Sequence, residues 1–143
     1  MRNFHPSNQA QLVLLSAYRP ERSLTENGDA SYALAEQLRG ANLAFDVCRG
    51  FWEGKEEQSF CVYLGEEGNA GNVYETIELL ARQFHQDAIL HVDSQGLVYL
   101  DWLNDTRDEL IGVWRELPEG AELPQGYTIF PNDKTFYAAP IGA

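Results

Sequence analysis

The sequence has few cysteines and no long apolar run. Its two cysteines, Cys48 and Cys61, are too few for the disulfide framework of a small secreted protein, so we expect two buried thiols. The longest apolar runs, such as residues 12–15, are far too short to span a membrane. Residues 1–10 are polar and lack the charged start and apolar centre of a signal peptide, which favours a cytoplasmic protein without membrane association.

Common signatures of catalysis and metal binding are also missing. The chain contains no G-x-S-x-G, P-loop or H-E-x-x-H pattern. Its three histidines, His5, His85 and His91, show no ligand spacing with either cysteine, so we expect no zinc site. A glycine-containing segment at 66–72 precedes a predicted helix start, but its two acids disfavour phosphate binding.

Basic residues are scarce. Ten Lys and Arg stand against 22 Asp and Glu, which gives a net charge of −12. Such a surface repels phosphates and disfavours nucleic acid as a partner, while a cationic small molecule or a basic protein surface remains open and plain solubility also explains the charge. A protein that mimics DNA would space its carboxylates evenly, whereas these acids are scattered among bases, which weakens that alternative.

The length of 143 residues fits a single domain spanning residues 1–143. The order of predicted elements is strand, helix, strand, strand, helix, strand, which predicts an α+β ferredoxin-like sandwich (β-α-β-β-α-β) with extra C-terminal strands. We expect a strand at 11–18, a loop at 19–28, a helix at 30–39 capped by Asp29, strands at 44–52 and 59–65 around a turn at 53–57, a helix starting at Asn72, strands at 88–93 and 97–102, a short helix at 105–117, and a last hairpin of 127–130 with 135–138.

Five short segments, in order over nearly the whole chain, carry a resemblance to a known family. They read LLSAYR at 14–19, EEQS at 56–59, QDAIL at 86–90, GLVY at 96–99, and LPEGAEL at 117–123 with YTI at 127–129. From Ser16 to Arg39 the spacing matches without a gap, and Asn27 coincides. In these segments the chain resembles the small S-adenosylmethionine (SAM) lyases of short-tailed phages, formerly catalogued as SAM hydrolases.

The resemblance implies an enzyme that splits SAM into 5′-methylthioadenosine and L-homoserine lactone by attack of the substrate's own carboxylate, without a metal or cofactor. It also implies a homo-oligomer, a trimer with sites between subunits, with an anti-restriction role for the phage in the cytoplasm of the infected host cell. Two alternatives stay open. One is a SAM hydrolase that yields homoserine, and the other is a non-enzymatic acidic decoy that binds host restriction enzymes.

The resemblance also implies the site residues. Glu57 holds the substrate ammonium and is the central catalytic residue, with Tyr18 as its catalytic partner. The residues implied for substrate binding are Ser16, Ala17, Trp52 and Gln86. The family has a tyrosine before its Glu-Glu pair, where this sequence has Phe51-Trp52, so a hydroxyl is either missing there or supplied by Tyr18 or Tyr63. By composition alone, Glu57 would be an exposed turn acid.

Overall fold

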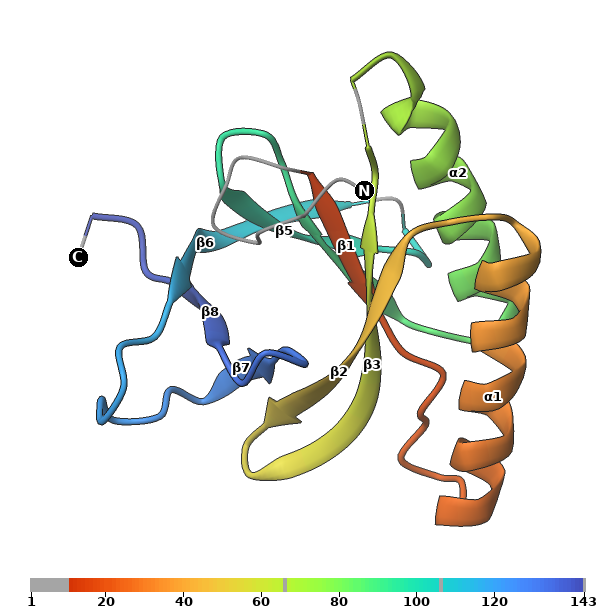
Figure 1. Cartoon of the computed structure of the whole chain (residues 1–143), viewed down its shortest axis with the longest axis horizontal. Helices are drawn as coiled ribbons and strands as arrows, with labels where there is room; N and C mark the ends of the chain where they lie inside the picture. The colour runs from red at the N-terminus through yellow and green to blue at the C-terminus, as the bar shows by residue number, and fades with distance from the viewer. Residues whose placement is uncertain (1–10, 66, 106, 143) are drawn as a thin grey trace.

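The computed structural model describes residues 11–65, 67–105 and 107–142. Within them, two helices lie against an antiparallel sheet of eight strands (Figure 1). The elements are β1 (Leu12–Leu15), α1 (Leu24–Gly40), β2 (Phe45–Trp52), β3 (Lys55–Tyr63), α2 (Glu67–Gln83), β4 (Ala88–Val92), β5 (Leu97–Trp102), β6 (Asp108–Glu116), β7 (Gly126–Ile129) and β8 (Thr135–Ala139).

The sheet closes on itself. Its strand order is β1-β3-β2-β7-β8-β6-β5-β4, and β4 pairs back to β1. The predicted α+β class, the order of the first six elements and the hairpins β2–β3, β4–β5 and β7–β8 are confirmed. The extra C-terminal strands do not leave an open sandwich, because β7 pairs with residues 49–52 of β2 and completes a barrel.

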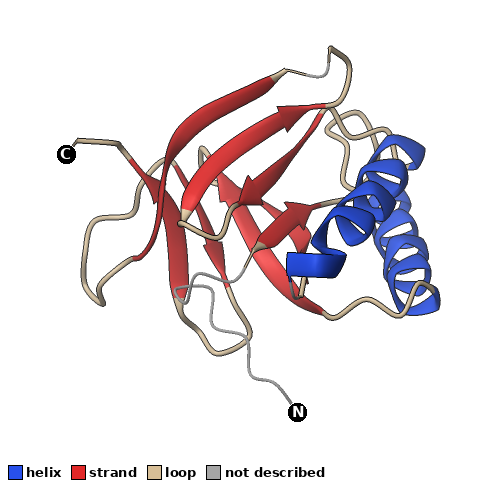
Figure 2. Cartoon of the chain, turned by 90° about the horizontal axis from the view of Figure 1, so that it is seen from above, coloured by secondary structure: helices blue, strands red, loops and turns tan. Residues whose placement is uncertain are grey.

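Two apolar cores result, one on each side of the sheet. The helix-side core lies between the outer face of the sheet and both helices, which pack on the same side of it (Figure 2). The barrel core fills the space that the strands enclose. Alternation along β1 serves both, since Val13 and Leu15 belong to the helix-side core and Leu12 and Leu14 to the barrel core.

Helix α1 begins earlier than predicted. Its N-cap is Ser23 rather than Asp29, and Ser23 forms a capping box with Glu26 in which each side chain bonds the other residue's backbone amide. These two bonds outweigh the turn signal of Asn27-Gly28 that predicted a loop over 19–28. Helix α2 likewise begins at Glu67, before the predicted start at Asn72. Neither helix of the described chain is long and apolar enough to cross a membrane.

The hairpin of β2 and β3 turns over two residues instead of the predicted five. Glu53 and Gly54 have φ of 50° and 81°, the left-handed conformation that both central residues of a tight type I′ hairpin turn adopt. The strands therefore pair up to Trp52 and Lys55. As a consequence, Glu57 lies inside β3 and not in a turn.

The helix predicted at 105–117 is wrong, because residues 108–116 form β6. This strand pairs with β5 on one side and β8 on the other, and those long-range bonds override the local pattern. Gly112 lies where the backbone of β8 approaches β6 closely. A side chain there would collide with the backbone carbonyl of Ala139.

We predict that Gly112→Ala destabilises the protein, because the new methyl group forces the β6–β8 seam apart. Overpacking of this kind costs about 1–3 kcal/mol. The matched control is Gly28→Ala on the exposed face of α1, where the new methyl group meets nothing within 4 Å and helix propensity should raise stability by about 0.5–1 kcal/mol. Urea unfolding of both variants measures the effect, and equal midpoints for the two would contradict the packing argument.

Candidate functional site

A pocket of about 400 Å³ opens between the start of α1 and the strands β2 and β3. This volume falls within the range of about 300–1,000 Å³ that is usual for small-molecule sites. The residues that line it are Tyr18, Leu24, Val47, Cys48, Arg49, Glu56, Glu57 and Gln58. Both residues that the family resemblance marks as catalytic, Tyr18 and Glu57, are thus brought to one pocket.

The pocket lies at a free edge of the sheet. Strand β1 ends at Leu15, opposite Phe60, so the preceding part of β3 has β2 as its one partner among the described strands. Glu57 lies in this part, beside the loop that carries Tyr18. A ligand at a free strand edge can contact groups from both faces of the strand, because no neighbouring strand separates them.

The two acids of the Glu56-Glu57 pair differ sharply in their surroundings. Neighbouring residues in a strand point to opposite faces. On one face, Glu56 accepts two hydrogen bonds from Arg49, each of 3.1 Å, and this cation lowers the pKa of Glu56 below its usual range. On the other face, Glu57 shares its side of the strand with Ser59 and Cys61 and lies opposite Gly50.

Glu57 has no hydrogen-bond or ion-pair partner within the described part of the chain. Its side chain keeps an exposed surface, yet the surrounding protein atoms desolvate the carboxylate and raise the pKa of Glu57 above its usual range. A desolvated carboxylate that lines a pocket is a candidate functional residue. Of the two acids, Glu57 is therefore the one available to hold a cationic ligand.

The loop after β1 is held by side chains. The hydroxyl of Ser16, which is 3% exposed, donates to the carbonyl of Gln58 at 2.7 Å and accepts from the amide of Tyr18 at 3.0 Å. Ala17 is fully buried in the helix-side core. The side chains of Ser16 and Ala17 are thus occupied within the fold, and Ser16 links the loop to the strand segment that carries Glu57.

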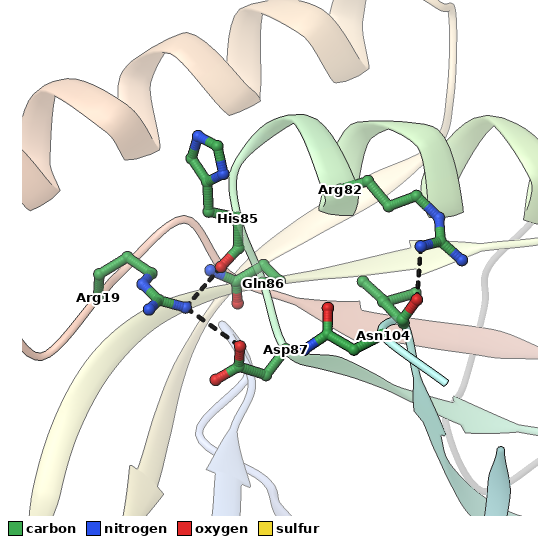
Figure 3. Close-up of a pocket in the computed structure, with 7 residues that line it drawn as sticks. Arg19, Arg82, His85, Gln86, Asp87 and Asn104 are labelled. Carbon is green, nitrogen blue, oxygen red and sulfur yellow. Dashed lines mark hydrogen bonds and ion pairs between the residues drawn. The ribbon is translucent and has the colours of Figure 1, made fainter. Parts of the chain in front are cut away.

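Gln86 lies on the other side of this loop. Its amide group donates to the carbonyl of Tyr18 at 3.2 Å. It also lines a second pocket, of about 350 Å³, together with Arg19 and Arg82 (Figure 3). Arg19 donates to the carbonyl of His85 at 2.6 Å, and Arg82 donates to that of Leu103, so both cations are tied to the backbone and brace the end of α2. Gln86 does not line the first pocket, and its link to that pocket is the hydrogen bond to the Tyr18 carbonyl.

Trp52 does not line the first pocket. It lies at the end of β2, 60% exposed, with its ring against Gly126, where any side chain would collide with the indole. Phe51 instead stacks on Tyr127, with ring centroids 4.7 Å apart, and Arg49 lies over the Phe51 ring. Trp52 is therefore outside the pocket lining, although it lies two residues from Gly50, the register partner of Glu57.

The family tyrosine is absent at Phe51-Trp52, and the sequence leaves Tyr18 or Tyr63 to supply its hydroxyl. Only one of these two tyrosines lines the pocket. Tyr63 is buried, and its hydroxyl donates to Asp46 at 2.6 Å on the barrel side of the sheet. Tyr18 is partly exposed and lines the pocket. Of the two tyrosines that the sequence offered, Tyr18 is thus the one in position.

Leu24, Val47 and Arg49 also line the pocket and were not predicted. Leu24 is 82% exposed in the first turn of α1, an unusual place for a leucine, and only the correct helix start would have drawn attention to it. The two cysteines are buried free thiols, as predicted, and burial raises the pKa of Cys48 to about 12. The described residues contain no group of three or more His, Cys, Asp or Glu arranged to hold a metal ion.

A comparison with curated proteins gave no match. A comparison with protein-family models matched residues 13–139 to the S-adenosylmethionine lyase family. The matched region runs from β1 to β8 and includes every residue that lines the first pocket. The chain therefore belongs to the S-adenosylmethionine lyase family, whose members are enzymes that act on SAM.

Proposed function

We propose that this enzyme converts SAM into 5′-methylthioadenosine and L-homoserine lactone within the pocket formed by Tyr18 and Glu57. The observation that carries the proposal is the unpaired, partly desolvated carboxylate of Glu57 at a free strand edge, in a chain of the SAM lyase family. SAM offers such a carboxylate a natural partner, because its amino acid tail ends in an ammonium group.

The reaction needs no protein nucleophile. The carboxylate oxygen of SAM attacks the γ-carbon of its own tail, and the bond between that carbon and sulfur breaks with its electron pair moving to sulfur. The products are a neutral thioether and a five-membered lactone, and no water enters. The positive sulfur and the negative carboxylate cancel as the bond forms, which a dry site favours. Holding the tail in the folded conformer is a positioning task that supplies up to about 7–11 kcal/mol.

Glu57 then acts as the grip on the substrate. A carboxylate that accepts a charge-assisted hydrogen bond from the ammonium fixes the rotamer of the tail. Glu56 is not equivalent, because its charge is already matched by Arg49. Tyr18, on the loop beside β3, supplies an aromatic ring and a hydroxyl at the same pocket. The net charge of −12 adds a long-range attraction for the cationic substrate.

The resemblance to the phage enzymes supports the biological part of the proposal. Removal of SAM in the cytoplasm of the infected host cell starves restriction systems that depend on it, which is an anti-restriction role. The same resemblance supports a homotrimer with sites between subunits. A pocket that lies at a free strand edge fits such a site, since a neighbouring subunit can close it. Light scattering of the active protein measures this state.

The product of the first turnover tests the reaction. We expect homoserine lactone as the early product, and in water enriched in oxygen-18 the lactone should carry no label, because the ring oxygen comes from the substrate. Mass spectrometry of quenched samples distinguishes the outcomes. Labelled homoserine from the first turnover, with no lactone before it, would instead establish hydrolysis with Glu57 as a general base for water.

We predict that Glu57→Gln folds and still binds SAM but loses turnover by about 10²-fold or more, equivalent to about 2.7 kcal/mol of transition-state stabilisation. Glutamine keeps the shape and one acceptor oxygen but not the charge that holds the ammonium. The matched control is Glu56→Gln on the opposite face, which should cost little. Wild-type turnover in Glu57→Gln together with loss in Glu56→Gln would move the site to the other face of β3.

The raised pKa of Glu57 generates a prediction on pH. The pH profile of kcat/KM, which reports the free enzyme, should fall on the acid side at a higher pH than the ordinary glutamate value of about 4.3, because the ionised form holds the substrate. The effect of pH on folding stability runs in the opposite direction, since ionisation of Glu57 favours substrate binding but disfavours the folded state. The folded state disfavours the charged carboxylate, so Glu57 destabilises the fold above its raised pKa and has no effect once pH falls below the unfolded value.

Glu57→Gln removes this penalty, so at neutral pH it should unfold at a denaturant concentration equal to or higher than that of the wild type. The two midpoints should converge in acid. Urea unfolding of both proteins at a series of pH values measures the difference. A Glu57→Gln variant that is less stable at pH 7 and recovers in acid would mean that Glu57 has a cationic partner in the fold.

A further inference from the structure

Asn27 is a buried polar side chain for which the proposed mechanism has no use. It lies in the first turns of α1 and is 6% exposed. A buried amide is costly unless its hydrogen bonds are made, at about 1–3 kcal/mol for a group left without a partner. The bonds that Asn27 makes therefore indicate what it does.

Both bonds of Asn27 go to the backbone of a single residue. Its Oδ1 accepts from the amide of Arg19 at 2.8 Å, and its Nδ2 donates to the carbonyl of Arg19 at 3.1 Å. This is the pair of bonds that an adjacent strand would make, offered here by a side chain from a helix. Arg19 lies beyond the end of β1, where strand pairing no longer holds the chain.

Tyr18 is the chain neighbour of Arg19, and its hydrogen bonds with described residues all involve its backbone. Its amide donates to Ser16 and its carbonyl accepts from Gln86. Its hydroxyl has no partner among the described residues, and its side chain lines the pocket with Glu57. The conformation of the Tyr18 side chain therefore depends on a backbone that the side chains of Ser16, Asn27 and Gln86 hold in place, and Asn27 makes two of these bonds, both to Arg19.

We infer that Asn27 is a positioning residue that fixes Tyr18 in the catalytic pocket. The inference rests on the proposed function, since it assigns a role to Tyr18 in turnover. Asn27 is well placed for this because α1 is anchored in the helix-side core by Leu34 and Leu38. Because α1 is anchored, the side chain of Asn27 can hold the backbone of Arg19, eight residues earlier in the chain, in a fixed position.

The test compares Asn27→Ala with Ser31→Ala. Ser31 is a matched control, because it is also a buried polar residue of α1, 1% exposed, and its hydroxyl has no partner in the described chain. Misplacement of a catalytic group by about 1 Å can cost about 10²-fold in rate. We expect kcat of Asn27→Ala to fall by at least about tenfold with a smaller change in KM, while Ser31→Ala keeps the turnover of the wild type.

Two further readouts separate positioning from general loosening. Hydrogen exchange of the Arg19 amide should speed up in Asn27→Ala while amides of β3 stay protected. In a double-mutant cycle with Tyr18→Ala, the loss caused by Asn27→Ala should largely disappear, because the residue that it positions is gone. Should Asn27→Ala not fold, Asn27→Asp takes its place, since it keeps the acceptor for the Arg19 amide and loses the donor to the carbonyl.

The outcomes are distinct. Faster local exchange with a large fall in kcat that depends on Tyr18 supports the inference. Faster local exchange with kcat within about twofold of the wild type overturns it, and so do losses from Asn27→Ala and Tyr18→Ala that simply multiply. A wild-type protein that does not consume SAM overturns the proposed function, whatever the exchange data say.

Discussion

The burial of β1 on both of its faces is the constraint on which the rest of the structure depends. All four of its side chains are apolar and at most 7% exposed. Each contributes about 1.5–3 kcal/mol when fully removed from water. One face of the strand needs the helices, and the other needs a sheet that curves until it encloses an interior. A fold with helices on the outside and a closed barrel on the inside satisfies both at once.

The candidate site arises where that constraint ends. Beyond Leu15 the chain leaves the sheet, β3 loses a neighbour, and the hydrogen bonds that strands would have made pass to the side chains of Ser16, Asn27 and Gln86. Side-chain bonds can shape a backbone in ways that a regular ladder cannot. The same departure leaves Glu57 unpaired at an open edge, so the end of one strand creates both the opening and its lining.

Local patterns predicted the parts of this fold that depend on local forces. The hairpins and the apolar faces of both helices follow from alternation and from helical spacing, as the burial of Leu34 and Ile77 shows. The N-cap of α1 at Ser23 was not predicted, because the turn signal of Asn27-Gly28 indicated a loop where the capping box of Ser23 and Glu26 begins the helix. The pattern over residues 105–117 favoured a helix, because the strand partners of residues 108–116 are set by the fold and not by local sequence. Barrel closure could not be predicted for the same reason.

The candidate site likewise depends on long-range contacts that local sequence patterns do not predict. Glu57 and Tyr18 were proposed from the family resemblance, and no spacing rule joins two residues 39 positions apart that meet only after β1 pairs with β3. The exposed Leu24 and the paired Arg49 gave no signal in the sequence. Asn27 coincided with the family pattern, yet its interpretation as a turn residue concealed that its side chain is buried.

The seam between β2 and β7 has a consequence for how the enzyme is made. It joins Arg49 to Ile129, so the strand that lines the pocket waits for residues from late in the chain. Contacts of such long sequence separation form slowly and late in folding. On the ribosome, β1, α1, β2 and β3 emerge well before β7 does, and β2 has an open edge throughout that interval. Assembly of the pocket walls thus coincides with the end of synthesis, when β7 covers the open edge of β2.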